Sequence, residues 1–454
     1  MMVKLNEQNR EQYEQLILDT LEAGDRKQFL DTFLELHPTD QVDFFIKLKD
    51  DRRKRVYDYL SPEDFSHIFE GLDIDDQKRI YQELDEPYSS EMFNNMFADD
   101  VADFLEAMTG GKAEDILQKM DQEEAQEVKE LMAYAPETAG AVMTKEYVSI
   151  TSTEVVSNVI DTLRKDAPDA ETIYYLYVVD EVERLVGVIS LRDLITAQPT
   201  ETIENVMGTR VVSVDDDMDQ EDVAQLIKKY DFLAVPVVSK QNHLIGIITV
   251  DDVIDILEEE ATEDFGEISA AKGATDVNVS SFKAARRRSP WIIMLMFFGL
   301  ITAGVIGQFE ETLEEIVLLA VFIPLIMDSA GNTGTQSLAV AVRGLALGTI
   351  KKGSIGKMVR REFGTGIMLG LICMAVLAIT VTIMYQHWML ALIVGFSIFC
   401  TLSIATVIGA TVPLIINKLK LDPAIASGPF ITTVNDILGL LIYFSIATAL
   451  LDFL

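Results

Sequence analysis

The sequence predicts a multidomain protein with an acidic all-α domain of helical repeats, a duplicated α/β module, a connecting helix and an all-α membrane domain of five helices. Three observations predict it. The 454 residues carry a net charge of −36, yet only nine acidic and eight basic residues lie from Pro290 onward. Two segments near the middle repeat each other at an offset of 59 residues, and long apolar runs fill the last third. We therefore expect parts at residues 1–135, 136–202, 203–260, 261–289 and 290–454.

The acidic excess before Pro290 restricts the classes of partner. Such a surface repels nucleic-acid phosphate and concentrates cations, so no nucleic acid is expected as a partner. Cys373 and Cys400 lie in apolar runs without metal-site spacing, and no nucleophile–base pair or phosphate-binding loop indicates an enzyme. The first residues lack the apolar core of a signal peptide, so the acidic part should stay in the cytosol.

Residues 1–135 have apolar residues at helical spacing, interrupted by regularly placed prolines. Pro38, Pro62 and Pro87 are separated by 24 and 25 residues, and acidic residues flank each one. Proline and acidic side chains suit the first turn of a helix, so stacked helical pairs are expected. Asp99 and Asp103 share a helical face, where they could hold a cation or form a solvated face.

The duplicated module repeats a strand, a turn, a second strand and a helix. VVDEVERLVGVISLRDLI begins at Val178 and VVSKQNHLIGIITVDDVI at Val237, and each contains Gly-x-x-Ser/Thr-x-x-Asp. The pair resembles tandem cystathionine-β-synthase (CBS) domains, which often bind adenine nucleotides between them. Some pairs of this kind bind nothing, so ATP stays an open alternative.

The repeated motif suits a nucleotide. Its glycine lets a backbone approach closely, its hydroxyl can donate to phosphate, and its aspartate can accept from ribose hydroxyls. Aromatic residues nearby could flank adenine or belong to the core. The candidates are Gly187, Ser190 and Asp193 in the first copy, Gly246, Thr249 and Asp252 in the second, Tyr175 and Phe232 for the ring, and Arg192 for phosphate.

The second copy ends in the acidic run DDVIDILEEEATED, and no Lys or Arg occurs between Lys240 and Lys272. Like charges four residues apart cost roughly 0.2–0.5 kcal/mol per pair on an exposed helix. The helix therefore needs cations to pack against another acidic surface, and carboxylates favour Mg²⁺ or Ca²⁺. A solvated acidic face is the alternative.

The connecting segment enters the membrane through Arg286, Arg287 and Arg288, and we expect Pro290 to open the first span. Four more spans are expected at about residues 316–342, 363–385, 388–416 and 424–451. The loop between the second and third spans and the loop between the fourth and fifth are basic, so both are expected on the cytoplasmic side of the membrane. The N-terminus is then cytoplasmic, and the C-terminus is outside the cell.

Asp436 lies midway along the last apolar run, where an ionised group should face protein or water. Steps of three and four residues from it reach Gly428, Thr432 and Gly439, a strip that suits a water-filled cation path. A purely structural pairing of Asp436 is the alternative. In the second span, polar residues recur every four positions and could line the same path or pack helices. They are Asp328, Asn332 and Gln336.

The order of parts, with the motifs GNTGTQ and DPAIASGPFITTVNDILGLLIYF, resembles the MgtE family of magnesium channels over essentially the whole chain. The resemblance implies a homodimer whose cytosolic sensor closes the pore when internal Mg²⁺ is high, with Asp436 of each subunit in the pore. It gives Asp328 no role. The regulatory Mg²⁺ positions that it implies are Glu221, Asp231, Asp252, Asp255, Glu260 and Glu263, with Asp99 and Asp103 matched more loosely.

These observations favour a Mg²⁺-selective channel for magnesium uptake across the plasma membrane. An ion-coupled secondary transporter of divalent cations is one alternative, although it should carry further intramembrane ionisable groups. A membrane-anchored adenine-nucleotide sensor is another, and it would leave Asp436 unexplained.

Overall fold

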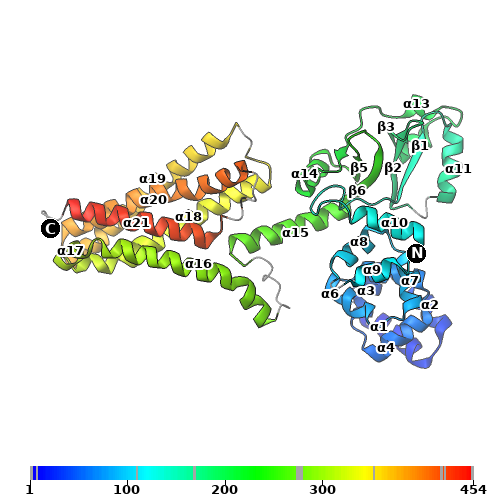
Figure 1. The fold of residues 1–454 in the computed structure, drawn as a ribbon, viewed down its shortest axis with the longest axis horizontal. Coiled ribbons are helices and arrows are strands. Elements are labelled where there is room, and N and C mark those ends of the chain that lie inside the picture. Colours follow the sequence, from blue (N-terminus) through cyan, green and yellow to red (C-terminus); the bar gives the residue numbers. More distant parts are fainter. Residues whose placement is uncertain are drawn as a thin grey trace. The chain divides into compact units, whose positions relative to one another are not determined.

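The computed structural model describes residues 4–6, 9–108, 111–166, 170–271, 280–350, 353–419, 423 and 426–450 (Figure 1). The chain forms two compact units, Met1–Ile254 and Asp255–Leu454. The first holds helices followed by two sheets, and the second consists of helices. The expected mixture of an all-α part, α/β modules and an all-α membrane part is confirmed.

The first unit opens with short helices whose first turns follow the proline pattern. Pro38, Pro62 and Pro87 occupy the first or second position of α3, α5 and α7, as expected. Ser61 caps α5 by accepting a hydrogen bond from the Asp64 backbone N–H. The helices are α1 Arg10–Ala23, α2 Arg26–Phe33, α3 Pro38–Ile46, α4 Asp50–Tyr59, α5 Pro62–Glu70, α6 Ile74–Tyr81, α7 Glu86–Asn94, α8 Ala98–Glu106, α9 Lys112–Leu117 and α10 Gln122–Leu131.

Aromatic side chains form the core of this helical part. Phe65 and Phe69 of α5 are fully buried, and the ring of Phe69 meets those of Phe93 and Phe104 edge-on at 5.9 and 5.3 Å. Such edge-to-face pairs add about 0.5–1.5 kcal/mol each to the burial of the rings. They join α5 to α7 and to the last turn of α8.

The α/β part contains two three-stranded sheets of the same design. Each has a parallel pair followed by an antiparallel one, in the orders β1-β2-β3 and β4-β5-β6. An isolated bridge joins Thr144 to Ile247 of β6, and another joins Gly208 to Val188 of β3. The elements are β1 Tyr147–Thr151, α11 Val156–Asp166, β2 Thr172–Val179, β3 Leu185–Ser190, α12 Leu191–Thr196, α13 Ile203–Val206, β4 Val214–Asp215, α14 Gln220–Tyr230, β5 Ala234–Val238 and β6 Leu244–Thr249.

The two sheets share one buried cluster, which contains Tyr177 and Leu185 from the first sheet and Val238 and Ile247 from the second. The glycine of each repeated motif packs directly against a methionine side chain. A methyl group on Gly187 would lie 2.4 Å from Met207 Sδ. The corresponding distance at Gly246 to Met143 Sδ is 2.6 Å, so both glycines make room for side chains of this chain.

The acidic run forms helix α15, Val250–Ile268. This helix passes through residue 260, where the sequence suggested the end of the second module. Nothing in DDVIDILEEEATED breaks a helix, so α15 continues for two further turns. Residues 272–279 of the expected connector lie outside the described part of the chain.

The second unit is a bundle of long helices. Four of them are long and apolar enough to cross a bilayer: α16, α19, α20 and α21. The second expected span, α18, has 29 residues and is also long enough, but Asp328 and the amide and hydroxyl side chains after it make it more polar. The helices are α16 Ser281–Gly307, α17 Glu310–Glu315, α18 Leu318–Ala346, α19 Ile355–Tyr385, α20 Trp388–Lys418 and α21 Gly428–Ala449.

Helix α16 runs without a break from the connecting segment, which was expected to be helical, through Pro290 into the first expected span. Ser280 caps it by accepting a hydrogen bond from the Lys283 backbone N–H. Lys357 and Arg361 lie in the first turns of α19 and not in a loop, because a helix can extend beyond the hydrocarbon layer. Residues 424 and 451, the expected ends of the last span, lie outside the described residues.

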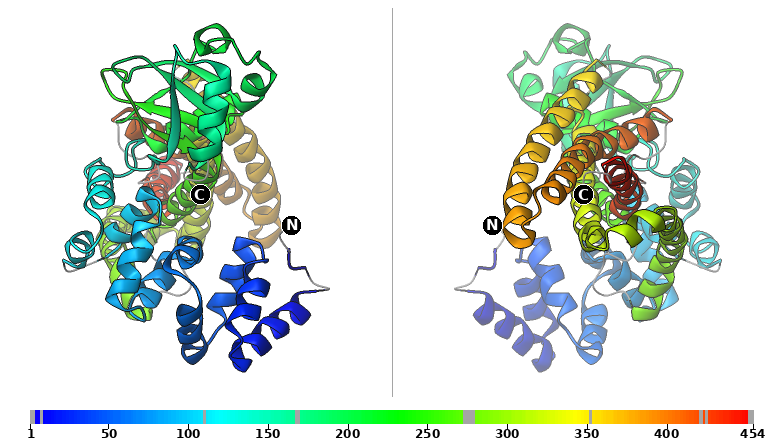
Figure 2. Two further views of the ribbon diagram at one scale, coloured as in Figure 1. Left: turned by 90° about the vertical axis from the view of Figure 1, so that its right-hand side faces the viewer. Right: turned by 90° about the vertical axis from the view of Figure 1, so that its left-hand side faces the viewer.

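Helices α18 and α21 contact each other along their length, and α16 lies along α21 (Figure 1). Helix α20 packs against α18 and α19, and Figure 2 shows α19 and α20 side by side. Tyr443 of α21 is fully buried and donates a hydrogen bond of 2.9 Å to the Leu319 carbonyl of α18. This bond fixes the register between the two helices that carry the intramembrane carboxylates.

Candidate functional site

The strip expected on the last span faces helix α18. A methyl group on Gly331 of α18 would lie 2.5 Å from Thr432 Cγ2 and 3.2 Å from Asp436 Oδ1. Thr335 lies within hydrogen-bond distance of Thr432, with 3.2 Å between their hydroxyl oxygens. Close helix approach at small residues is typical of membrane packing. The carboxylate of Asp436 is therefore held against protein and not against lipid.

Asp436 is half-buried, and its Oδ1 is buried without a hydrogen-bond partner in the described part of the chain. A carboxylate oxygen in a membrane helix is costly unless a proton, a water or a cation satisfies it. Gly428 and Gly439 belong to the same face, since they lie against Thr335 and against Ala330. These two glycines allow α18 and α21 to approach closely, and Asp436 places a carboxylate where the helices cross.

The polar residues expected on α18 lie on an exposed face of the single chain. Asp328, Asn332 and Gln336 are all exposed, and the Asn332 amide donates a hydrogen bond of 3.1 Å to Asp328 Oδ1. Asp328 lies one turn before Gly331, which contacts Asp436. The structure thus brings the two carboxylates to the same helix crossing, and an unsatisfied polar surface continues from it along α18.

Two polar residues of the membrane unit were not identified from the sequence. Asn435 is fully buried, and neither polar atom of its amide has a hydrogen-bond partner in the described residues. Glu362 is also buried, and it accepts hydrogen bonds from Ser337 and Arg361. Glu362 precedes the apolar run that located the third span, which is why the sequence pattern did not reveal it.

A cluster of carboxylates lies in the first unit, where the start of α8 meets the α/β part. Glu146 accepts a hydrogen bond of 3.1 Å from the Ala98 backbone N–H at the start of α8. The next two residues of α8, Asp99 and Asp100, are half-buried, and Asp99 Oδ1 has no hydrogen-bond partner in the described residues. Glu171 lies beside Glu146, because its backbone N–H donates a hydrogen bond to the Glu146 carbonyl.

Burial and mutual repulsion raise the pKa values of three carboxylates in this cluster, Asp99, Asp100 and Glu171. Burial, followed by the charge of Asp100, raises the pKa of Asp99 well above its usual range. Burial and the charge of Glu70 raise the pKa of Asp100 to about 8. Burial and the charge of Asp252 raise the pKa of Glu171 to about 7. The cluster joins segments far apart in sequence, and a bound cation would relieve its repulsion.

The regulatory residues expected from the sequence lie in three different places: the carboxylate cluster, α14 and α15. The structure brings Asp99 and Asp252 into one electrostatic cluster, and Asp103, although exposed, is close enough for its charge to raise the pKa of Asp100. Glu221 lies in the first turn of α14, and Asp231 ends that helix in the left-handed conformation. Along α15 lie Asp255, Glu260 and Glu263. No group of three or more carboxylate, histidine or cysteine side chains in the described residues has the geometry of a preformed metal site.

The repeated Gly-x-x-Ser/Thr-x-x-Asp motif has a structural role that the sequence interpretation missed. Ser190 donates a hydrogen bond of 2.6 Å to Asp193 Oδ2 and accepts the Asp193 N–H. Thr249 donates a bond of the same length to Asp252 Oδ2. Ser190 thus caps α12, and at the start of α15 the Asp252 carboxylate accepts both the backbone N–H and the hydroxyl of Thr249, as in a capping box. Each hydroxyl directs its proton at the aspartate three residues further on.

The aromatic candidates also have partners. Tyr175 packs against the cluster between the sheets, and the ring of Phe232 stacks on that of Tyr230 with 5.4 Å between centroids. Arg192 and Asp193 are exposed at the start of α12.

Family models match three parts of the chain. The model described as a divalent cation transporter, MgtE, matches residues 323–446. The MgtE intracellular N domain matches residues 36–137, and CBS domains match residues 139–200 and 203–259. Together they follow the order of parts expected from the sequence.

Relatives match nearly the whole chain. A magnesium transporter, MgtE, from Bacillus subtilis is 42% identical over 96% of this chain and 98% of its own length. A second, from Enterococcus faecalis, is 40% identical over 97% and 98%. The curated relatives that match nearly the whole chain are named as transporters and not as enzymes.

Two solved structures each match slightly more than half of this chain. The soluble part of a magnesium transporter is 42% identical, with a TM-score of 0.55, and covers 56% of this chain and 99% of its own. The cytosolic domain of the Mg²⁺ channel MgtE in complex with ATP is 36% identical, with a TM-score of 0.51, over 54% and 99%.

Proposed function

This chain belongs to the MgtE family of magnesium transporters, and from that premise we propose that it is a Mg²⁺-selective channel for magnesium uptake that closes when Mg²⁺ binds its acidic cytosolic surfaces. The observation that carries the proposal is the Asp436 carboxylate, which a membrane helix holds at a close crossing with α18. One Asp436 oxygen has no protein partner among the described residues. A cation in transit is the partner that such a group suits.

The pore would be built by two copies of the chain. Asp328, Asn332 and Gln336 form a polar exposed face on α18, and a polar face on a membrane helix requires protein or water beside it. In a homodimer this face would line a water-filled path together with Thr432 and Asp436. Because Mg²⁺ gives up water reluctantly, the two Asp436 carboxylates would hold the ion through its waters.

The sensor would be the carboxylate cluster around Asp99, Asp100 and Asp252, together with the acidic positions along α14 and α15. Without Mg²⁺, the charges that raise the pKa values in this cluster push its segments apart. Mg²⁺ would neutralise the repulsion and favour the compact arrangement, in which the connecting segment blocks the pore. Ions that bind one state preferentially shift the population to that state.

Several finer features belong to the same proposal. The chain is a multi-pass membrane protein, and we place its N-terminus in the cytoplasm and its C-terminus outside. We keep the division at residues 1–135, 136–202, 203–260, 261–289 and 290–454, with α15 continuous across the third boundary. ATP is a candidate ligand because a relative's cytosolic domain was solved with it. Tyr175, Arg192, Asp193 and Phe232 remain the candidate contacts.

Mg²⁺ currents from inside-out patches test the proposal, with Mg²⁺ at the cytosolic face raised from micromolar to millimolar. We expect currents that close as Mg²⁺ rises, none with Asp436→Asn, and currents that no longer close when Asp99, Asp100 and Asp252 are all changed to Asn. Glu314→Gln, an exposed change in α17, is the matched control for removing a carboxylate from the membrane unit and should retain current. Conduction by Asp436→Asn, or uptake that needs a proton or sodium gradient, would reject the channel mechanism.

A further inference from the structure

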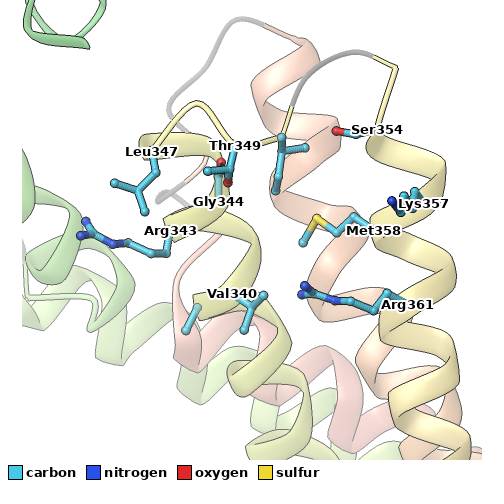
Figure 3. Close-up of a pocket in the computed structure, with 11 residues that line it drawn as sticks. Val340, Arg343, Gly344, Leu347, Thr349, Ser354, Lys357, Met358 and Arg361 are labelled. Carbon is cyan, nitrogen blue, oxygen red and sulfur yellow. Dashed lines mark hydrogen bonds between the residues drawn. The ribbon is translucent and has the colours of Figure 1, made fainter. Parts of the chain in front are cut away.

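A cavity of about 760 Å³ lies at one end of the membrane unit, where α18 ends and α19 begins. Arg343 on α18 and Lys357 and Arg361 on α19 supply its charge (Figure 3). Its remaining wall is mostly apolar and includes Val340, Leu347 and Met358. In Figure 3, Arg361 extends from α19 toward α18. The cavity therefore combines cations with aliphatic surface.

The local charge differs from that of the chain as a whole. No Asp or Glu occurs between Asp328 and Glu362, although six Lys and Arg residues do, in a chain of net charge −36. In the described part of the chain, neither Arg343 nor Lys357 has an acidic partner. Arg361 is bound to the buried Glu362. At least two cations of the cavity are thus available to an anion.

The apolar surface continues from the cavity along α19. Met368 and Ile372 are exposed, with 66% and 60% of their surface accessible, and their spacing of seven and eleven residues from Arg361 places them on its side of a membrane-spanning helix. A small soluble anion would use only the cations. A phospholipid would place its phosphate at the cations and its acyl chains along these side chains.

We propose that this cavity, which we call the α18–α19 cavity, binds an anionic phospholipid through Arg343, Lys357 and Arg361. The proposal does not depend on the channel mechanism. The site lies at a helix end, where the headgroup layer of a bilayer meets the hydrocarbon. A bound lipid would bridge α18, which carries Asp328, to the lipid-facing helix α19.

Native mass spectrometry of the full-length protein in detergent tests the proposal. Phosphatidylglycerol is the probe, and phosphatidylcholine with the same acyl chains is the zwitterionic comparison. Wild type should retain the anionic lipid preferentially. The double variant Arg343→Gln/Lys357→Gln should bind it about 25-fold more weakly, since each basic side chain near a headgroup contributes roughly a factor of five.

The matched control is Arg286→Gln/Arg360→Gln, which removes two exposed charges that do not line the cavity and should bind like wild type. Ala339→Trp keeps every charge and fills the apolar wall, so it should also weaken phosphatidylglycerol binding. Equal retention of both lipids by wild type would overturn the proposal, as would unchanged binding by the double variant or by Ala339→Trp.

Two further outcomes identify a different occupant. Displacement of phosphatidylglycerol by inorganic phosphate would show that the cations bind a free anion, and the lipid assignment would fail. Loss of a dimeric mass in Arg343→Gln/Lys357→Gln, with lipid binding intact, would assign the cavity to an interface between two copies and would equally overturn it.

Discussion

Asp100 offers a direct test of whether repulsion destabilises the carboxylate cluster. Its pKa is raised to about 8, by burial first and then by the charge of Glu70. A carboxyl group whose folded pKa exceeds its unfolded value stabilises the fold most below the unfolded pKa. That contribution is lost as the pH rises through the folded pKa. Between about pH 4 and pH 8, wild type should therefore lose stability that Asp100→Asn retains.

The size of the effect follows from the pKa difference. pH 7 lies about three pH units above the reference pKa of about 3.9. At about 1.36 kcal/mol per unit, the loss in the free energy of unfolding is about 4 kcal/mol. Asp100 is only half-buried, so we reduce this by half for solvent screening, to about 2 kcal/mol. Asp100→Asn should accordingly raise the melting temperature by about 4–8 °C.

Thermal unfolding followed by circular dichroism measures this on a fragment ending at Ala271, since the corresponding part of a relative was solved alone. The gain should be largest without Mg²⁺ at about pH 8 and should vanish near pH 4. Mg²⁺ should stabilise wild type more than Asp100→Asn. Asp31→Asn, an exposed change in α2, is the control and should shift stability by less than about 0.5 kcal/mol.

Two results would refute this reasoning. If Asp100→Asn were less stable than wild type throughout the pH range, the carboxylate would make a favourable contact that outweighs its repulsion. If Mg²⁺ stabilised both proteins equally, the ion would act elsewhere, and the cluster would not belong to the sensor.

Three further predictions concern packing and are measured by thermal unfolding. Tyr443→Phe in the full-length protein should cost about 1 kcal/mol, because the Leu319 carbonyl loses a buried hydrogen bond. Gly409→Ala should lower stability and yield markedly, since the new methyl group would lie 2.1 Å from a backbone oxygen of α18; wild-type stability would contradict this. Gly246→Ala should cost more than Gly187→Ala, because only the former meets a backbone oxygen at 2.8 Å, and equal costs would contradict the argument.

The order of parts could be predicted from the sequence because each part has its own local signal. Proline with acidic neighbours starts α3, α5 and α7, and the 59-residue repeat marks the two sheets. Helix ends were less accurate. The start of α16 is set by a cap at Ser280, and a polar cap ten residues before the apolar run that begins at Pro290 leaves no trace in hydropathy.

The repeated Gly-x-x-Ser/Thr-x-x-Asp motif shows where a local pattern fits two interpretations. Its residue types suit a nucleotide, and the same spacing also satisfies a helix start, because the hydroxyl and the aspartate bond to each other. Its glycine is explained by Met207 in one copy and Met143 in the other. The contact of each glycine with its methionine shows the structural role. The sequence does not reveal this contact, because the two residues are 20 positions apart in one copy and 103 in the other.

The two groups of costly carboxylates differ in how they can be found. Asp436 is evident in the sequence because the apolar run around it defines its environment locally. Asp99, Asp100 and Glu171 lie in polar stretches of sequence, and they become costly only because the fold joins α8 to two segments of the α/β part. Each carboxylate alone would be a solvated surface group. The cost of Asp436 is therefore a property of one segment, whereas the cost of the carboxylates in the first unit is a property of the packing, so an ion bound there would report whether that packing has formed.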